Sequence, residues 1–409
     1  MKQKRDFAAL SVSKRAEISI ESGHPWIYDS EVFGEDRAGC RDGDLADVFS
    51  RAGKYLGTGF YNHHSKIRIR LISRSANDCF DEAFWERRLR WAWEYRKTVM
   101  GHDLESCRII FGEADQFPGL TVDRFGSILV TQTLSLGIEQ RKQLLFSLLV
   151  RILREDGQEI RAVYERNDVA IRLHEGLSEN KGFFPLEGET PPDSAVTVIT
   201  ENNIRYAVDF ANGQKTGFFL DQKYNRQAVA RLARGRKVLD CFTHTGSFAL
   251  NAARSGAEQV HAVDISEEAV TMARENAKLN GLEERMSFET ANVFDLLPSL
   301  EKQGHPYDFI ILDPPAFTKS RQTVENAMRG YKEINLRAMK LLPRGGYLAT
   351  CSCSHFATDE LFCKMLQEAA ADVGVSLRQI EARQQSPDHP ILWNVPETNY
   401  LKFYLFQIV

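Results

Sequence analysis

The chain has 409 residues, 43% of them hydrophobic and 26% charged, which predicts two or three globular domains with sizeable cores. These proportions exclude collagen, a long coiled coil and wholesale disorder. The 52 basic and 56 acidic residues give a net charge of −4, so the chain does not coat nucleic acid by bulk electrostatics.

Seven cysteines are scattered along the chain without a CxxC pair. This pattern argues against a disulfide framework and a zinc site, and it is typical of a reducing compartment. No apolar stretch follows the basic N-terminus, so no signal peptide is expected. The most apolar run, 144–153, is too short to cross a bilayer. We expect a cytoplasmic protein with no bound metal and no membrane partner.

Residues 1–75 have the pattern of a small β-rich domain. Lys66–Leu71 alternates basic and apolar residues, as a strand with one buried face does. Lys66, Arg68 and Arg70 then share one face, on which they could contact RNA phosphates. The alternative is a solvated outer strand face. Residues 1–100 carry 18 basic and 15 acidic side chains, a small excess in the direction expected of an RNA-facing domain.

Residues 76–190 predict a second, α+β domain. The segment Phe84–Val99 is aromatic and basic with helical spacing. Strands are expected at 107–111, 119–133 and 159–174, with a turn at Asp123-Arg124-Phe125-Gly126, and a helix is expected over Ile138–Asp156. The best candidate for a linker after this domain is Pro191-Pro192-Asp193.

Residues 191–409 alternate apolar strands with helices, which predicts an α/β domain with a parallel, doubly wound sheet. In such sheets the ligand lies outside the carboxyl ends of the strands. The expected strands are Lys237–Cys241, Gln259–Asp264, Met286–Thr290, Phe309–Asp313 and Gly346–Cys351, and the expected helices are Ser247–Ser255, Glu267–Asn280, Thr323–Leu342 and Asp359–Val373.

Aspartates end the first two of these strands. Asp240 precedes a turn that reaches Gly246, and Asp264 follows 24 positions later. An acidic residue about twenty positions on can accept both ribose hydroxyls of a nucleoside cofactor. The turn lacks the GxGxxG pattern that brings backbone close to a pyrophosphate. The expected ligand therefore carries a nucleoside but no phosphate, which indicates S-adenosylmethionine; a generic βα turn is the alternative.

Two further strand ends carry polar residues. Asn292 can hydrogen-bond an adenine amino group, or it can simply cap a helix. Asp313-Pro314-Pro315-Ala316-Phe317 forms a rigid loop, because consecutive prolines are excluded from strand and helix interiors. Enzymes that methylate exocyclic amines of bases use a similar loop, so this element alone does not identify the target atom.

The segment Thr350-Cys351-Ser352-Cys353-Ser354 favours carbon methylation. Cytosine C5 becomes nucleophilic only after a thiolate adds at C6. Strand alternation puts Cys351 and Cys353 on one face, with Cys353 nearer the carboxyl edge. A buried cysteine without chemistry is the alternative for either residue.

With these motifs the chain resembles the RlmI/RlmO-type methyltransferases, which make 5-methylcytosine in bacterial large-subunit ribosomal RNA. The segment 213–222, GQKTGFFLDQ, is similar to the signature of that family, and so are the Asp-Pro-Pro loop and the Ser352-Cys353-Ser354 triplet. Gly23-His24-Pro25-Trp26 resembles the start of the family's N-terminal PUA domain, an RNA-binding pseudo-barrel.

The resemblance implies a class I, Rossmann-like methyltransferase domain over 191–409, a PUA-like domain over 1–75 and a central α+β domain over 76–190. It assigns catalysis to Cys353 and Asp313, although a Thr-Cys motif, as in two-cysteine RNA methyltransferases, would select Cys351 instead. The expected cofactor-binding residues are Gln214, Lys215, Thr216, Asp221, Gln222, Asp240, Phe242, Thr243, Gly246, Ser247, Phe248, Asp264, Ile265, Asn292, Val293, Asp313 and Pro314.

The leading hypothesis is an S-adenosylmethionine-dependent RNA cytosine-C5 methyltransferase that acts on ribosomal RNA. One rival is an RNA guanine N-methyltransferase, which would use the Asp-Pro-Pro loop and need no cysteine. A second rival is an RNA-binding module with a vestigial cofactor pocket. The target nucleotide, the base that removes the C5 proton and the choice between a monomer and a homodimer are left open by the sequence.

Overall fold

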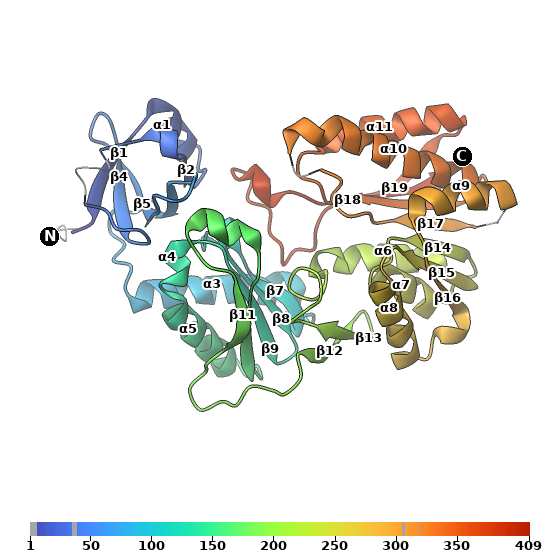
Figure 1. The fold of residues 1–409 in the computed structure, drawn as a ribbon, viewed down its shortest axis with the longest axis horizontal. Coiled ribbons are helices and arrows are strands. Elements are labelled where there is room, and N and C mark those ends of the chain that lie inside the picture. The colour runs from blue at the N-terminus through green and yellow to red at the C-terminus, as the bar shows by residue number, and fades with distance from the viewer. Residues whose placement is uncertain (1–5, 35–38, 305–306, 319) are drawn as a thin grey trace. The chain divides into compact units, whose positions relative to one another are not determined.

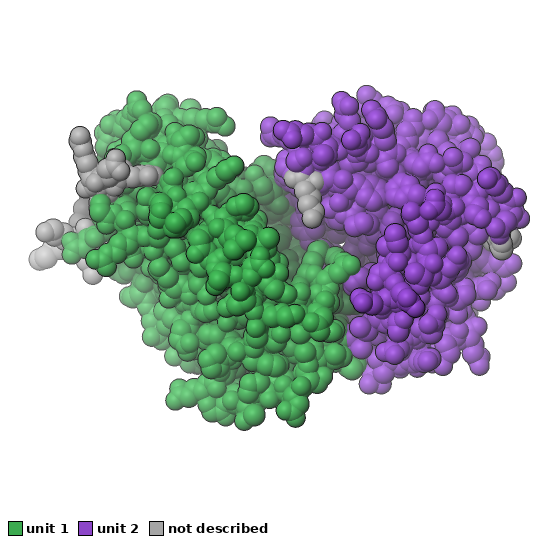
Figure 2. All heavy atoms as spheres, viewed as in Figure 1, with its two compact units in different colours: residues 1–199, 208–220, 387–398 green, residues 200–207, 221–386, 399–409 purple. Residues whose placement is uncertain are grey.

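The computed structural model describes residues 6–34, 39–304, 307–318 and 320–409. The chain divides into two compact units, each built from segments far apart in the sequence (Figure 2). Unit 1 comprises residues 1–199, 208–220 and 387–398, and unit 2 comprises residues 200–207, 221–386 and 399–409. Among the described residues, no helix is both long enough and apolar enough to cross a membrane.

Unit 1 begins with a six-stranded sheet in the order β2-β6-β5-β4-β1-β3 (Figure 1). The short helix α1 (Lys14–Glu21) follows β1 in the sequence. Gly59 lies where β5 and β6 approach closely, since a Cβ there would come within 2.4 Å of the Arg70 carbonyl oxygen. The strands are β1 (Ala8–Val12), β2 (Trp26–Ile27), β3 (Val32–Phe33), β4 (Leu45–Ser50), β5 (Tyr55–Tyr61) and β6 (Ile69–Ser73).

A five-stranded sheet in the order β11-β10-β9-β8-β7 forms the second part of unit 1. The segment 119–133 forms two strands, and the turn expected at 123–126 begins later, at Gly126, because β8 extends to Phe125. The expected helix 138–156 is divided between α4 and α5. The elements are α3 (Glu82–Met100), β7 (Ser106–Phe111), β8 (Leu120–Phe125), β9 (Ile128–Thr133), α4 (Leu136–Glu139), α5 (Lys142–Glu155), β10 (Ala162–Asn167) and β11 (Asn180–Phe184).

Helix α3 combines a capping side chain at its start with the helical spacing that its sequence predicted. The Asp81 side chain caps its first turn by accepting from Phe84 N. Trp85, Leu89 and Trp93, spaced four residues apart, are all buried. The basic residues of this helix are not all on the surface, however, because Arg88 and Arg96 are buried as well.

Unit 2 contains a seven-stranded sheet in the order β16-β15-β14-β17-β18-β20-β19. Strands β14 to β18 are mutually parallel, which confirms the predicted α/β class, and β20 pairs antiparallel with both β18 and β19. The strands are β14 (Lys237–Cys241), β15 (Gln259–Asp264), β16 (Met286–Thr290), β17 (Phe309–Leu312), β18 (Tyr347–Ser352), β19 (Leu377–Arg383) and β20 (Lys402–Ile408).

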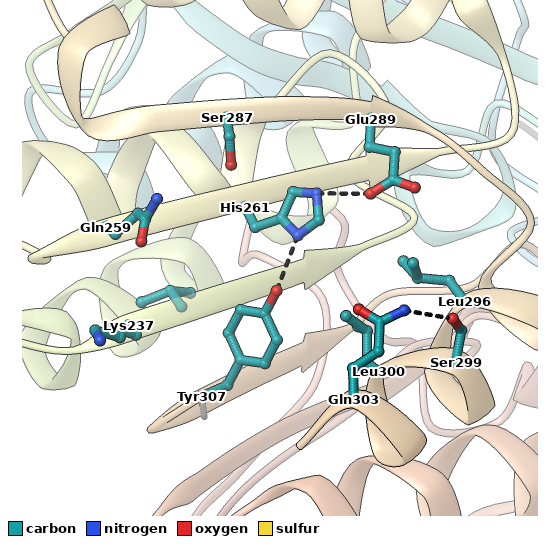
Figure 3. A pocket seen from close by; sticks show the side chains of 11 residues that line it. Lys237, Gln259, His261, Ser287, Glu289, Leu296, Ser299, Leu300, Gln303 and Tyr307 are labelled. Atoms are coloured by element: carbon teal, nitrogen blue, oxygen red, sulfur yellow. Dashed lines mark hydrogen bonds and ion pairs between the residues drawn. The ribbon is translucent and has the colours of Figure 1, made fainter. Parts of the chain in front are cut away.

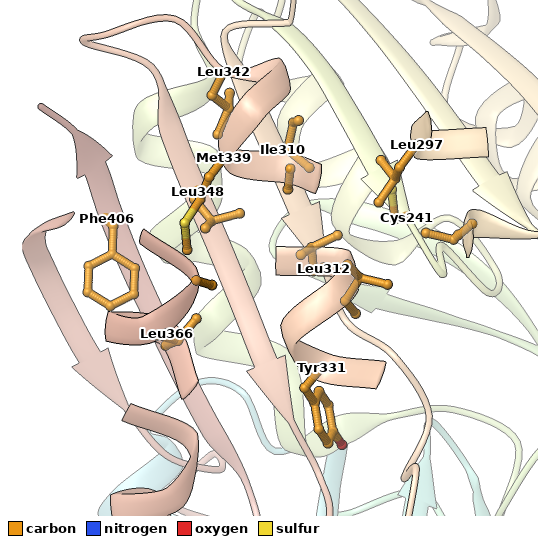
Figure 4. Packing of buried hydrophobic residues seen from close by; sticks show 14 of the residues in the cluster. Cys241, Leu297, Ile310, Leu312, Tyr331, Met339, Leu342, Leu348, Leu366 and Phe406 are labelled. Atoms are coloured by element: carbon orange, nitrogen blue, oxygen red, sulfur yellow. The ribbon is translucent and has the colours of Figure 1, made fainter. Parts of the chain in front are cut away.

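Helices cover both faces of this sheet (Figure 1). A large core forms where α9, α10 and α11 pack on β14, β17, β18 and β20, with Leu312, Tyr331, Leu348 and Phe406 among its buried members (Figure 4). The helices are α6 (Lys223–Ala233), α7 (Ser247–Arg254), α8 (Glu267–Leu279), α9 (Val293–Gln303), α10 (Val324–Leu341) and α11 (Asp359–Val373). A separate two-stranded sheet pairs β12 (Val196–Glu201) with β13 (Ile204–Asp209).

Candidate active site

Asp240, the residue before the last one of β14, is fully buried and accepts hydrogen bonds from the loop and helix that follow the strand. Its Oδ2 accepts hydrogen bonds from Thr243 Oγ1 at 2.6 Å and from Ala249 N at 2.9 Å. Its Oδ1 has no hydrogen-bond partner among the described residues. Burial raises the pKa of Asp240 to about 7, and the carboxylates of Asp313 and Asp264 act in the same direction.

The backbone between β14 and α7 is unusually tight. Phe242 and His244 have φ angles of 63° and 51°, a left-handed backbone conformation that residues other than glycine rarely adopt. Gly246 also has a positive φ, and a Cβ there would lie 3.0 Å from the Cβ of Ala273. Such strain persists where surrounding contacts enforce it, and it is concentrated at functional sites.

Asp264, at the end of β15, ties this loop to the next one. Its two carboxylate oxygens accept from His244 N at 2.9 Å and from Ser266 N at 3.0 Å. The next residue, Ile265, is 71% exposed. The strand ends of β14 and β15 therefore meet at one edge of the sheet, as parallel pairing requires.

Asn292 caps α9, because its side chain accepts a hydrogen bond from Phe294 N at 3.1 Å. The cap does not exclude a second bond, since an amide oxygen has two lone pairs. Phe294 is partly exposed, with its ring 5.9 Å from that of Phe317. Among the predicted cofactor residues, Phe248 and Val293 are buried, so their side chains belong to the core around the site.

Asp313 follows β17 and is held by the side chain of Gln222, whose Nε2 donates to Oδ1 at 2.9 Å. Gln222 Oε1 in turn accepts from Asn225 at 2.7 Å, which fixes the orientation of its amide. Cys351 is fully buried beside these two side chains. Burial, with the Asp313 carboxylate next in effect, raises the pKa of the Cys351 thiol well above its usual value. A thiol in this environment is a poor nucleophile.

Cys353 lies in a different environment. Strand β18 ends at Ser352, so Cys353 stands beyond the strand end, where it is partly exposed. Its Sγ lies 3.8 Å from the carbonyl oxygen of Pro314. The hydroxyl of Tyr331 holds both neighbours of Cys353, at 3.1 Å from Ser352 Oγ and 2.9 Å from Ser354 Oγ. Cys351 and Cys353 thus differ in burial and in their neighbouring groups, although strand alternation predicted that they share one face.

The GQKTGFFLDQ segment is divided between the units. Gln214, Lys215 and Thr216 belong to unit 1, where the buried Thr216 hydroxyl donates to Asp123 at 2.5 Å. Asp221 belongs to unit 2, where it is buried and its Oδ2 accepts from the hydroxyl of Tyr400 at 2.6 Å.

The basic residues at 66–70 do not form the shared strand face that the sequence predicted. Lys66 is exposed but precedes β6, which begins at Ile69. Arg70 is on the strand, but its side chain is only 11% exposed and its Nη2 lies 2.7 Å from a carboxylate oxygen of Glu175. Arg70 is therefore committed to an ion pair within unit 1, and a continuous basic strand face does not form.

Unit 2 also contains a cavity of about 400 Å³ under α9 (Figure 3). Its wall includes a hydrogen-bonded chain in which His261 contacts Tyr307 at 2.9 Å and Glu289 at 3.0 Å. Lys237 and Gln259 from the amino-terminal ends of β14 and β15 also line it. The cavity thus lies away from the strand ends that carry the predicted motifs, and the described lining includes none of the predicted cofactor residues.

Two residues next to the cysteines were not identified from the sequence. In the sequence, Tyr331 cannot be distinguished from the other buried residues of α10. Lys402 is the buried first residue of β20, directly before an apolar run, and it lies opposite Ser352 in the antiparallel pair. A single lysine inside a buried strand is the signal by which it could have been found, because lysine is almost never buried without a partner.

Comparison with known proteins identifies the family. Residues 186–407 match the model of an S-adenosylmethionine-dependent methyltransferase domain, and residues 10–74 match that of a PUA-like domain. The chain is 40% identical over 405 residues to ribosomal RNA large subunit methyltransferase I of Klebsiella pneumoniae, covering 98% of this chain and 99% of the relative. The Escherichia coli protein of the same name is 39% identical over 403 residues, with the same coverage.

The chain belongs to the ribosomal RNA large subunit methyltransferase I family. It is an S-adenosylmethionine-dependent methyltransferase, as its motifs predicted. A solved SAM-dependent methyltransferase chain from Streptococcus mutans superimposes with a TM-score of 0.80 at 21% identity, covering 98% of this chain and all of the other. A second solved methyltransferase, SMU.776, was determined with SAH bound and gives a TM-score of 0.82, also at 21% identity and with the same coverage. These two structures confirm the fold.

Proposed function

We propose that this chain transfers a methyl group from S-adenosylmethionine to C5 of a cytosine in large-subunit ribosomal RNA. The name shared by its relatives supports ribosomal RNA as the substrate. The observation that supports C5 as the target is the contrast between the two cysteines. Cys353 is partly exposed next to the Asp-Pro-Pro loop, whereas Cys351 is buried with its thiol pKa raised.

The charge at the strand ends of unit 2 fits this cofactor. Burial raises the pKa of Asp240, and the carboxylates of Asp313 and Asp264 lie close enough to raise it further. Such a group of carboxylates favours a cationic ligand. S-adenosylmethionine carries a sulfonium and an ammonium group. Asp264 is suited to the ribose hydroxyls, and the exposed Ile265 side chain offers an apolar surface to the adenine. Asn292 retains a lone pair for the adenine amino group.

When bound, S-adenosylmethionine supplies an electrophilic methyl group. The Cys353 thiolate adds to C6 of the cytosine, forming the Sγ–C6 bond and making C5 nucleophilic. The C5–methyl bond then forms as the sulfonium–methyl bond breaks. Loss of the C5 proton to a base breaks the Sγ–C6 bond and returns Cys353 as a thiolate. Asp313 is suited to hold the cytosine at N3 rather than to activate the thiol, because a nearby carboxylate disfavours a thiolate.

We assign RNA docking to the N-terminal part of unit 1. Three segments, 1–75, 76–190 and 191–409, are proposed as the functional domains, and the matched ranges 10–74 and 186–407 support the first and the last. Lys66 and Arg68 stay candidates for phosphate contacts, and Arg70 is better explained by its ion pair with Glu175. Sedimentation equilibrium distinguishes a monomer from the homodimer that the sequence left open.

The experiment that tests this proposal traps the covalent adduct. Ribosomal RNA carrying 5-fluorocytosine is incubated with S-adenosylmethionine and the wild-type, Cys351→Ala or Cys353→Ala enzyme. Fluorine cannot leave C5 as a proton does, so the adduct persists. We expect crosslinking to the wild type and to Cys351→Ala, but not to Cys353→Ala, which should also lose methyl transfer while retaining cofactor binding.

The reverse pattern would transfer the role of nucleophile to Cys351. Turnover by the double variant Cys351→Ala/Cys353→Ala would contradict C5 chemistry and leave the guanine N-methyltransferase hypothesis. Mapping of 5-methylcytosine in ribosomal RNA from a deletion strain then identifies the nucleotide that is methylated.

A further inference from the structure

The strand β20 brings a lysine next to the proposed nucleophile. Because β20 is antiparallel to β18, Lys402 lies opposite Ser352, the last residue of β18. The Lys402 Nζ reaches across and donates to the carbonyl oxygen of Ser354 at 2.7 Å. It also donates to the carbonyl oxygen of Tyr400 at 3.0 Å. The ammonium group is therefore held against the Ser352-Cys353-Ser354 triplet.

Lys402 is only 7% exposed, and its two hydrogen-bond acceptors are neutral carbonyls. Neutral acceptors orient an ammonium group without cancelling its charge. A buried charge of this kind is expensive unless an opposite charge compensates it. The arrangement therefore calls for an anion beside Lys402, and the triplet that it contacts contains a group that can become one.

We propose that Lys402 is a positioning residue that stabilises the thiolate form of Cys353 and so prepares it to add to the pyrimidine ring. In this step the S–H bond of Cys353 breaks, its proton passes to solvent, and Lys402 keeps its three protons. The sulfur then carries the electron pair that forms the bond to C6. This role rests on the proposed function, in which Cys353 is the nucleophile.

The electrostatics of the surrounding groups agree with this role. Burial lowers the pKa of Lys402 to about 8, and the Cys353 thiolate and the Asp359 carboxylate oppose that effect by favouring the charged ammonium. The interaction is reciprocal, because a thiolate that stabilises the ammonium is stabilised by it to the same extent. Among the described groups, the Tyr331 hydroxyl on α10 and the buried Cys351 thiol also interact with Cys353. Asp359 already accepts a hydrogen bond from Tyr404 at 2.7 Å.

The test measures the reactivity of the thiol without RNA or cofactor. The rate of alkylation of Cys353 by iodoacetamide is followed by peptide mass spectrometry between pH 6 and pH 10. The exposed Cys79 serves as an internal reference thiol. The variants are Lys402→Met, which removes the charge, Lys402→Arg, which retains it, and Lys364→Met as a control at an exposed lysine of the same unit.

We expect Lys402→Met to slow alkylation of Cys353 about tenfold at pH 7, a shift of one pKa unit in the midpoint, with rates that converge at high pH. Lys402→Arg and Lys364→Met should keep the wild-type midpoint. An unchanged midpoint in Lys402→Met, or a rate reduced by one factor at every pH, would overturn the proposal, because loss of packing alone does not move a titration.

A second measurement needs no lysine variant and so remains valid if Lys402→Met does not fold. The ultraviolet absorbance of the thiolate is titrated in the wild type and in Cys353→Ser, and the difference reports Cys353. A midpoint below the ordinary thiol value of about 8.5 supports the proposal, and a midpoint above it overturns it. Neither experiment depends on methyl transfer. If Cys353→Ala retained activity, the proposed function would fail while the interaction between Lys402 and the thiol could still be measured.

Discussion

The buried carboxyl group of Asp240 makes the stability of unit 2 depend on pH in a way that can be calculated. The pKa is about 7 in the folded protein, against an ordinary value of 3.8. The folded chain therefore binds this proton more tightly than the unfolded chain does. The free energy of unfolding contributed by Asp240 falls as the pH rises from about 4 to about 7, and it is constant above that window.

Each pKa unit corresponds to about 1.4 kcal/mol, so the two units between pH 5 and pH 7 correspond to about 3 kcal/mol. The variant Asp240→Asn removes this titration. Its amide oxygen can still accept the hydrogen bonds from Thr243 and Ala249. Relative to the variant, the wild type should lose about 3 kcal/mol of unfolding free energy between pH 5 and pH 8.

The assay is urea unfolding, monitored by circular dichroism, at pH 5, 6, 7 and 8 without cofactor. Asp295→Asn, at an exposed carboxyl of α9, is the matched control for the substitution itself. The difference in unfolding free energy between the wild type and Asp240→Asn should increase steadily up to pH 7. Parallel curves for these two proteins would refute the reasoning, since they would mean that Asp240 titrates alike in the folded and unfolded chains.

Two other substitutions test the remaining parts of the site. Asp264→Ala should weaken S-adenosylmethionine binding by about ten- to a hundredfold in calorimetry, because a charged hydrogen bond contributes about 1.5–3 kcal/mol; an unchanged affinity would show that another carboxylate holds the ribose. Lys66→Ala should reduce the slope of log affinity for RNA against log salt concentration by about one, because one phosphate contact is lost. Arg70→Ala should instead lower the unfolding free energy by about 3 kcal/mol, because it leaves Glu175 buried without its ion pair, and a change confined to the RNA salt dependence would contradict that assignment.

The parallel part of the sheet and the position of its ligand edge could be predicted from the sequence. Asp240 and Asp264 lie at or near the ends of short segments rich in apolar and β-branched residues, and such segments are recognised directly as strands. Parallel pairing then brings the two strand ends to one edge, and the hydrogen bond from His244 N to Asp264 joins the loops there. Local pattern was sufficient because each strand, turn and helix is encoded by neighbouring residues.

The antiparallel end of the sheet could not be predicted in this way. Strand β20 lies between β18 and β19, although β19 precedes it in the sequence, and no local periodicity records which strands become neighbours. Lys402 therefore reaches the Cys353 segment only through a pairing between residues that are about fifty positions apart. The ion pair of Arg70 could not be predicted for the same reason, since its partner Glu175 lies 105 residues away in the sequence.

The two cysteines show most clearly what each level of structure decides. The sequence by itself determined that Cys351 and Cys353 lie at the ligand edge of the sheet, two residues apart in one short segment. Only the tertiary structure placed the end of β18 at Ser352, so that Cys351 is enclosed by Gln222 and Asp313 while Cys353 stands beyond the strand next to Pro314. Alternation along a strand defines which face a side chain points to. The burial of a thiol and the charges around it depend instead on elements that are distant in the sequence and pack against it in the folded chain.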